Sequence, residues 1–150
     1  MKTFTLEEAS TLLPVLESLL KRAVVAKEKV ELRQLEFAAL SQKIMLNGGV
    51  LVRVVDAARR RAEHDHALKE AKDVIGEIDA IGVQVKDLDT GLLDFPFQLG
   101  DEVVLLCWKM GETEIGWWHR VEDGFRGRQP LDGRFGAKRA GKQDEGERPN

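Results

Sequence analysis

Carboxylates gather in the segment VKDLDTGLLDFP, residues 85–96, which contains Asp87, Asp89 and Asp94. Carboxylates held close together can act as general acid and base, or can bind a cation through oxygen. The triplet DTG that begins at Asp89 matches the one in aspartic proteases, but that chemistry needs two such aspartates in a mostly β fold. A calcium loop needs further oxygen ligands at fixed spacing, followed by a helix. The simpler hypothesis is that Asp87 and Asp89 accept hydrogen bonds from turn amides.

A thiol and an imidazole, Cys107 and His119, lie on two consecutive predicted strands. Such a pair can ligate a metal ion or act as nucleophile and base. The strand register decides whether they meet: with Val104 opposite His119 they point to opposite faces, and a slip of one residue puts them on one face. Because the chain has no CxxC or HxxxH spacing, we predict no metal site and no cofactor. On that hypothesis Cys107 is a small buried apolar residue and His119 a hydrogen-bonded residue near the end of the sheet.

Three tryptophans, Trp108, Trp117 and Trp118, fall within one short segment. They suit the core of a small sheet, and aromatic-rich sheets also bind ligands or peptides by stacking. Neighbouring charged residues would then supply specificity. The predicted ligand-binding candidates are the acidic, aromatic and basic residues of this region: Asp87, Asp89, Asp94, Trp108, Glu112, Trp118, His119 and Arg128.

Two clusters in the preceding helical region carry a weaker signal. His64 and His66 are two residues apart, so on a helix their side chains point about 200° apart and cannot share one ion without ligands from another helix. The run Arg59 to Arg61 is typical of a solvated helix face, or it meets an acidic partner.

The elements that position these residues begin with two helices. Thr5 and Glu8 form a capping-box pattern, which predicts a helix start. Apolar residues then recur at a 3–4 spacing up to the breaker that begins at Asn47 and includes Gly48 and Gly49, and a second stripe runs from Leu51 to Gly82. Pro14 predicts a kink, or a short first helix with a second one starting near it.

Two helices joined by a short glycine turn must run antiparallel, so residues 5–82 are predicted to form a long helical hairpin with arms of about 50–60 Å. Such a hairpin leaves apolar surface exposed. We therefore expect it to form a homo-oligomer or to pack against a protein partner.

Strand patterns replace the helical ones from Val83 onward. Predicted strands cover 83–85, 92–97, 102–108 and 115–121, with Pro96 suited to an edge or a strand end. The strongest strands are apolar on both faces, so the sheet should be covered on both sides. The fold class is α+β: one domain over residues 1–132, with the helical hairpin (5–82) followed by a small antiparallel β unit (83–132). Residues 133–150 read as a disordered tail.

Composition limits the functional classes. The chain of 150 residues has one cysteine, which fits a reducing compartment, and no apolar run long enough to span a membrane, so we expect a cytoplasmic protein with no membrane partner. The β unit carries 5 Lys/Arg against 10 Asp/Glu, a net charge of −5. Because phosphate neutralisation supplies most nucleic-acid affinity, nucleic-acid binding by this unit is not expected.

Two sequence blocks resemble a known family. FTLEEAxxLLP (4–14) and the block from VKDLDTGLLDFP to GFRGRQPL (85–131) are similar to the uncharacterised bacterial domain-of-unknown-function family 2203. The resemblance covers residues 3–131 and implies an autonomous domain, but no activity. The positions that fit the signature are Asp87, Asp89, Gly91, Asp94, Pro96, Cys107, Trp108, Gly111, Glu112, Trp118, His119, Gly124 and Arg128.

Two functional hypotheses follow. The first is an interaction or scaffold protein that dimerises through the hairpin and binds a ligand or partner through the β unit. The second is a small enzyme or metal-binding protein with a carboxylate and histidine site in the β unit. The chain has no phosphate-binding loop, nucleophile elbow or metal-ligand spacing, which favours the first hypothesis. The sequence leaves open whether the protein is an enzyme.

Overall fold

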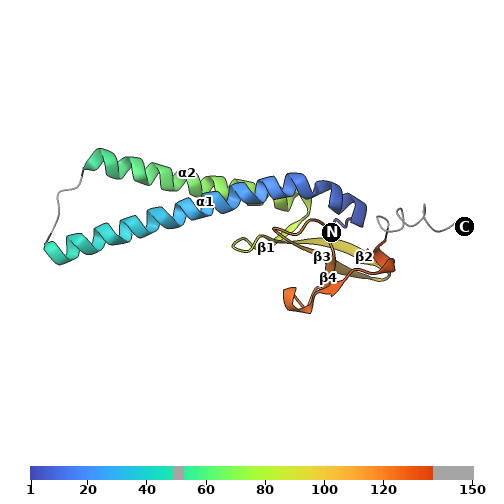
Figure 1. Cartoon of the computed structure of the whole chain (residues 1–150). Coiled ribbons are helices and arrows are strands. Elements are labelled where there is room, and N and C mark those ends of the chain that lie inside the picture. The colour runs from blue at the N-terminus through green and yellow to red at the C-terminus, as the bar shows by residue number, and fades with distance from the viewer. Residues whose placement is uncertain (49–52, 137–150) are drawn as a thin grey trace, which may run out of the picture.

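A long helical hairpin leads into a small sheet, as predicted for an α+β chain (Figure 1). The computed structural model describes residues 1–48 and 53–136. The five strands are antiparallel and lie in the sheet in chain order. The elements are α1 (Leu6–Asn47), α2 (Val54–Ile81), β1 (Gln84–Asp87), β2 (Leu92–Leu99), β3 (Glu102–Lys109), β4 (Trp117–Arg120) and β5 (Gln129–Pro130), with 3-10 turns η1 (Phe125–Gly127) and η2 (Gly133–Phe135).

The first helix begins at the predicted capping box. The Thr5 hydroxyl accepts a hydrogen bond from the Glu8 amide at 3.0 Å, and the Glu8 carboxylate accepts one from the Thr5 amide at 2.9 Å. The helix then runs without interruption past Pro14 to Asn47, so the expectation of a separate first helix was wrong. Ala9 and Leu16, which lie on either side of Pro14 in the sequence, are fully buried. This packing outweighs the loss of the one backbone hydrogen bond that Pro14 removes.

The other helix ends also follow the sequence. Gly48 ends α1 and Gly82 ends α2, each in the left-handed conformation that favours glycine. Of the residues that were assigned to the turn and to the start of the second stripe, Gly49 and Leu51 lie outside the described residues.

Full burial between the two helices is confined to the half next to the sheet, although Arg33 still pairs with Glu63 and Phe37 packs on His64 further out. Buried residues reach Val30 in α1 and begin at Ala67 in α2. Further out, no residue of the described parts of either helix is buried. Figure 1 shows the two helices moving apart towards this distal end. The hairpin is therefore a compact base with a more open, solvent-exposed arm.

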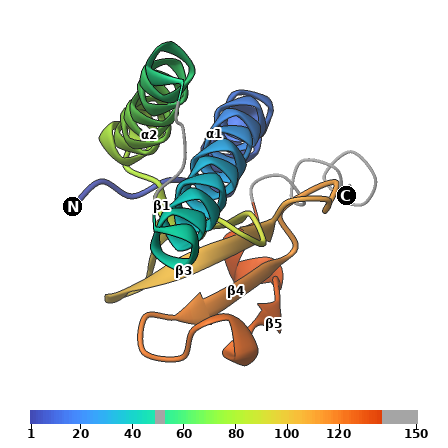
Figure 2. The same cartoon turned by 90° about the vertical axis from the view of Figure 1, so that its left-hand side faces the viewer.

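One face of the sheet packs against the helices, as Figure 2 shows. The apolar residues of this helix-facing side belong to the same core as the first turns of α1 and the last turns of α2. Because side chains alternate along a strand, the residues between them point to the opposite, outer face. The helix-facing set is Leu93, Phe95, Phe97, Val104, Leu106, Trp108 and Trp118.

The outer face is partly covered by the chain itself. Phe125 of η1 lies beneath the ammonium group of Lys109, with Nζ 6.0 Å from the ring centre. The Arg128 guanidinium stacks between the rings of Phe125 and Trp117, at 4.6 and 4.8 Å. The sequence predicted cover on both faces of the sheet, and these contacts supply it without a second molecule at this position.

Pro96 lies inside β2 rather than at a strand end, which corrects that alternative. Its carbonyl oxygen accepts a hydrogen bond from the Phe4 amide at 2.8 Å. The N–H and C=O of one strand residue point to the same side, and β1 pairs with β2 only as far as Asp94. The proline nitrogen therefore points to a locally open edge, where a missing donor breaks no ladder hydrogen bond.

The first four residues of the predicted disordered tail, 133–136, have a defined structure. Gly133–Phe135 form η2, capped by the Asp132 side chain, and Phe135 is only 3% exposed. Its ring packs on Phe97 and Trp118, with centroids 4.9 and 5.3 Å apart. The prediction of disorder was wrong for residues 133–136 because a single aromatic completes the core, and residues 137–150 lie outside the described residues.

Neither described helix contains an apolar stretch of the length and purity needed to cross a bilayer.

Candidate functional site

The strand register brings three ionisable side chains to one place on the outer face. Asp94 of β2 lies directly opposite Cys107 of β3, and His119 of β4 lies opposite Leu105, two residues along. Of the two registers that the sequence left open, this one puts Cys107 and His119 on the same face. Three adjacent strands therefore each contribute one side chain to what we call the outer-face centre: Asp94, Cys107 and His119.

The centre is closed to solvent. Asp94 is 1% exposed, Cys107 0% and His119 2%. One potential ligand atom from each side chain can be chosen so that all three lie within 4.8 Å of one another. Buried ionisable groups are costly unless they are paired or bind a metal, so this arrangement needs a chemical explanation that a group of exposed acids would not.

The hydrogen bonds of His119 fix its orientation. Its Nδ1 lies 2.8 Å from the Arg120 carbonyl oxygen, and its Nε2 lies 3.2 and 3.1 Å from the two Asp94 carboxylate oxygens. A carbonyl oxygen can only accept, so Nδ1 carries a proton. Nε2 faces the Asp94 carboxylate. Nε2 and the carboxylate share one further proton, because without it their lone pairs would repel each other in a buried site.

Burial shifts the acidity of the two other members. Removal from water raises the pKa of the Asp94 carboxyl above its ordinary value, although the nearby imidazole opposes the shift. Burial, followed by the negative charge of Asp94, raises the pKa of the Cys107 thiol from 9.0 to about 12. Because the thiolate is the reactive form, a sealed thiol with this pKa is a poor nucleophile. The geometry thus argues against cysteine-based catalysis.

A second layer lies beside the centre. The Glu112 carboxylate accepts hydrogen bonds from the Lys109 amide at 2.9 Å and from the Arg128 guanidinium at 2.8 Å. The Arg128 charge acts to lower the pKa of Cys107 and the Glu112 charge acts to raise it, so both lie within electrostatic reach of the thiol. The Arg128 guanidinium of this ion pair lies over the rings of Trp117 and Phe125, and Trp117 is the cross-strand neighbour of Cys107.

The remaining predicted candidates lie elsewhere. The Asp87 carboxylate accepts a hydrogen bond from the Asp89 amide at 3.0 Å, the turn bond expected for this segment. Asp89 is exposed and pairs with Lys27 of α1. Trp108 and Trp118 are buried on the helix-facing side. The structure therefore joins Asp94 and His119 and borders them with Glu112 and Arg128, while four candidates are directed away: Asp87, Asp89, Trp108 and Trp118.

Cys107 is the residue that the list of ligand-binding candidates lacked. The strand pattern contained a signal for Cys107, because the alternation of side chains puts Cys107 and His119 either on the same face or on opposite faces. The observed register, with Leu105 opposite His119, puts them on the same face. Sequence patterns do not choose between two registers when both strands are apolar on both faces.

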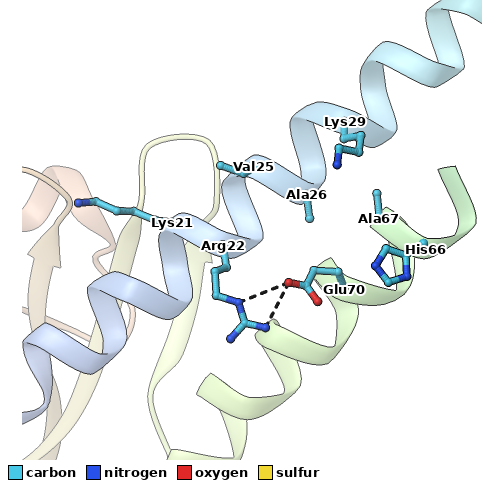
Figure 3. A pocket seen from close by; sticks show the side chains of 8 residues that line it. All are labelled: Lys21, Arg22, Val25, Ala26, Lys29, His66, Ala67 and Glu70. Carbon is cyan, nitrogen blue, oxygen red and sulfur yellow. Dashed lines mark hydrogen bonds and ion pairs between the residues drawn. The ribbon is translucent and has the colours of Figure 1, made fainter. Parts of the chain in front are cut away.

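The helical histidines form no comparable site. Among the described residues, neither His64 nor His66 belongs to a group of three potential metal ligands. His66 lines a groove of about 330 Å³ between α1 and α2 (Figure 3). In this groove Arg22 donates two hydrogen bonds to Glu70, at 3.4 and 3.2 Å, so these two opposite charges are already paired with each other.

The raised thiol pKa predicts a loss of stability in alkali. The unfolded thiol releases its proton near pH 9 and the folded thiol near pH 12, so this contribution is complete below pH 9 and disappears as the pH rises through that range. Between pH 8 and 10, with chelator present, the wild type should lose about 1.4 kcal/mol more unfolding free energy than Cys107→Ala. Urea titrations at both pH values measure this, and equal losses in the two proteins would contradict it.

Comparison with known proteins gives a family and no activity. A family model described as "Uncharacterized conserved protein (DUF2203)" matches residues 2–131. No curated protein and no solved structure shows a significant match. The matched range includes every residue of the outer-face centre and of the layer beside it.

Proposed function

Because the chain belongs to the DUF2203 family, whose description names no activity, we propose its function from the geometry of the outer-face centre alone. The protein binds one divalent transition-metal ion, with zinc as the favoured ion, through Asp94, Cys107 and His119. The observation that carries this proposal is the proximity of three different ligand atoms, all within 4.8 Å of one another, on side chains that are at most 2% exposed.

The orientation of His119 supports a metal ligand. Metal-bound histidines almost always donate their other ring N–H to a carbonyl or carboxylate, which fixes the tautomer. Here Nδ1–H donates to the Arg120 carbonyl, so Nε2 is directed towards Asp94 and Cys107. A thiolate, an imidazole and a carboxylate together suit zinc, whereas calcium and magnesium prefer oxygen ligands alone.

Charge balance supports the same ion. Without metal, Cys107 holds one proton and the Asp94–His119 pair shares another, so the centre is neutral overall. Binding requires the thiolate, the carboxylate and a neutral imidazole. A divalent ion thus replaces two protons and leaves the net charge of the buried centre unchanged, which avoids the large cost of burying a net charge.

The proposed role is binding rather than catalysis. A catalytic zinc site keeps one coordination position open to water or substrate. All three ligands here are at most 2% exposed, so the proposed ion would be shielded from substrate. Binding would then stabilise the sheet, or make its stability depend on the supply of metal.

We predict that the metal-free protein takes up one Zn²⁺ or Co²⁺ per chain and releases two protons. Calorimetry in buffers of different ionisation enthalpy measures both numbers. Cobalt should add a thiolate-to-metal charge-transfer band, which reports the Cys107 ligand directly. His119→Ala and Cys107→Ala should each lower the affinity by at least about a hundredfold, because each removes a direct ligand.

Asp89→Ala is the matched control for this titration, since it removes an exposed carboxylate of the same strand-and-turn segment and should leave the affinity unchanged. Circular dichroism checks that each variant is folded. A folded wild type that binds no stoichiometric ion, or whose cobalt complex lacks the thiolate band, would refute the proposal.

The hairpin supports a second role, as an arm that carries an interaction surface away from the sheet. On α1, Val25, Leu32 and Leu35 are 59%, 52% and 69% exposed, although they lie well inside a regular helix. Apolar side chains at a spacing of three and seven residues suit pairing with another helix, including that of a second copy. The exposed fractions of apolar side chains are higher still towards the distal end of the hairpin.

A further inference from the structure

Charge is divided along the length of the molecule. Residues 39–61, the distal end of the hairpin, contain 5 Lys/Arg and 1 Asp/Glu, a net charge of +4. Residues 62–82 contain 2 against 6, a net of −4, and the β unit adds −5. The described part of this distal end, residues 39–48 and 53–61, is called the tip from here on. The molecule is therefore an elongated dipole with its positive charge at the tip.

The tip also carries the densest group of exposed apolar side chains in the described chain. Its members come from the end of α1 and the start of α2. Their exposed fractions reach 81% for Met45, 77% for Val54 and Val55, 74% for Leu46 and 40% for Ile44. The ends of two helices have no structural need for five such residues, and strongly exposed apolar side chains gathered at one end of a molecule mark interaction sites.

Cations surround this apolar group. Lys43, Arg53 and the run Arg59 to Arg61 are all exposed. The one acid of the tip, Asp56, pairs with Arg53 and Arg59 at 3.3 and 3.2 Å. The combination of protruding apolar side chains with a basic surround is the pattern of protein segments that lie in the headgroup region of a bilayer.

We infer that the tip docks on an anionic lipid surface, with its apolar side chains among the headgroups and its cations on the lipid phosphates. Its shape favours a bilayer over a protein partner, because the five exposed large apolar side chains of the tip lie on a protruding end and do not line the groove of about 240 Å³ beside them, which Leu40, Arg53 and Asp56 help to form. The charge division favours it further, since a negative surface attracts the tip and repels the acidic base and β unit. The inference rests on the arm role proposed above and is independent of the metal. It replaces the expectation of no membrane partner, which considered only segments that span a bilayer.

Vesicle flotation with the full chain tests this inference. Binding is expected to vesicles of phosphatidylcholine with phosphatidylglycerol, to be weak with phosphatidylcholine alone, and to fall as salt rises. Arg59→Gln/Arg60→Gln/Arg61→Gln and, separately, Val54→Ser/Val55→Ser should each lower the partition coefficient by at least about tenfold. Val15→Ser/Val121→Ser is the matched control, because it removes two apolar side chains that are 54% and 61% exposed and lie away from both the tip and the pairing surface of the arm, and it should bind as the wild type does.

Three outcomes would overturn the inference. Equal binding to neutral and anionic vesicles is one. A second is binding to a soluble acidic polypeptide that is as tight as binding to anionic vesicles and is not weakened by Val54→Ser/Val55→Ser. That result would indicate an acidic protein partner. The third is no vesicle binding at all. In that case light scattering separates the proposals: a dimer would leave the arm role standing, and a monomer would overturn the arm role as well.

Discussion

His119→Leu is expected to lower the free energy of unfolding of the metal-free protein by about 3–5 kcal/mol, because it leaves Asp94 buried without its partner. Both Asp94 oxygens lie within 3.2 Å of His119 Nε2, and both residues are at most 2% exposed. With only the weak Cys107 thiol left as a side-chain hydrogen-bond partner, the Asp94 carboxyl would have to hold a proton to stay buried. Since its folded-state pKa would then lie far above the unfolded value, the loss should be larger at pH 8 than at pH 5.

The matched control is the double variant Asp94→Leu/His119→Leu. Replacing both members of a buried pair by apolar residues is often neutral or stabilising, whereas removing one member is not. We therefore expect the double variant to be more stable than His119→Leu alone. Urea unfolding with chelator present measures all three proteins. A double variant at least as unstable as the single one would show that the site tolerates no apolar filling, and would contradict this account of the pair.

Leu20→Ala is expected to cost about 2–5 kcal/mol, the range for truncating a fully buried leucine. Leu20 is 0% exposed and belongs to the core that the helices share with the sheet. It also packs at the β1–β2 turn, where a side chain on Gly91 would lie 3.4 Å from its Cδ2. The change should therefore weaken both parts of the fold at once. Thermal or urea unfolding measures the loss, and Val15→Ala, at a 54% exposed position of the same helix, is the control.

The same experiment tests the single-domain prediction for residues 1–132. Far-ultraviolet circular dichroism reports mainly the helices, and tryptophan fluorescence reports the sheet, because all three tryptophans lie in or next to β3 and β4. If the hairpin and the β unit form one cooperative unit, both signals should change at the same urea concentration in the wild type and shift together in Leu20→Ala. Separate midpoints would show two units.

The helical part of the fold was predictable because its signals are local. The capping box at Thr5 and the glycines at 48 and 82 set the helix ends through backbone chemistry that depends on few neighbours. Pro14 shows where this reasoning fails. A local penalty of one hydrogen bond suggested a break, and the burial of Ala9 and Leu16 by distant parts of the chain overrode it.

The outer-face centre was only half predictable for the opposite reason. Asp94 and His119 were candidates from their chemistry, but their contact depends on how β2, β3 and β4 align. A shift of one residue would have put His119 opposite Val104 and away from Cys107. The aspartates of the turn were included because they crowd together in sequence. In the structure, Asp87 serves the turn and Asp89 reaches α1, so crowding in sequence did not produce a shared site.

The chain-order topology of the sheet has a consequence for synthesis on the ribosome. Both helices emerge from the ribosome before β1 does, because all five strands follow them in sequence. The growing chain then presents the sheet-facing side of α1, including Leu16 and Leu20, to water until β2 and β3 emerge. A nascent hairpin of this kind is a substrate for chaperones and is prone to associate through the same leucines. Once strand synthesis begins, each new strand finds its neighbour immediately upstream, so the exposed interval ends quickly.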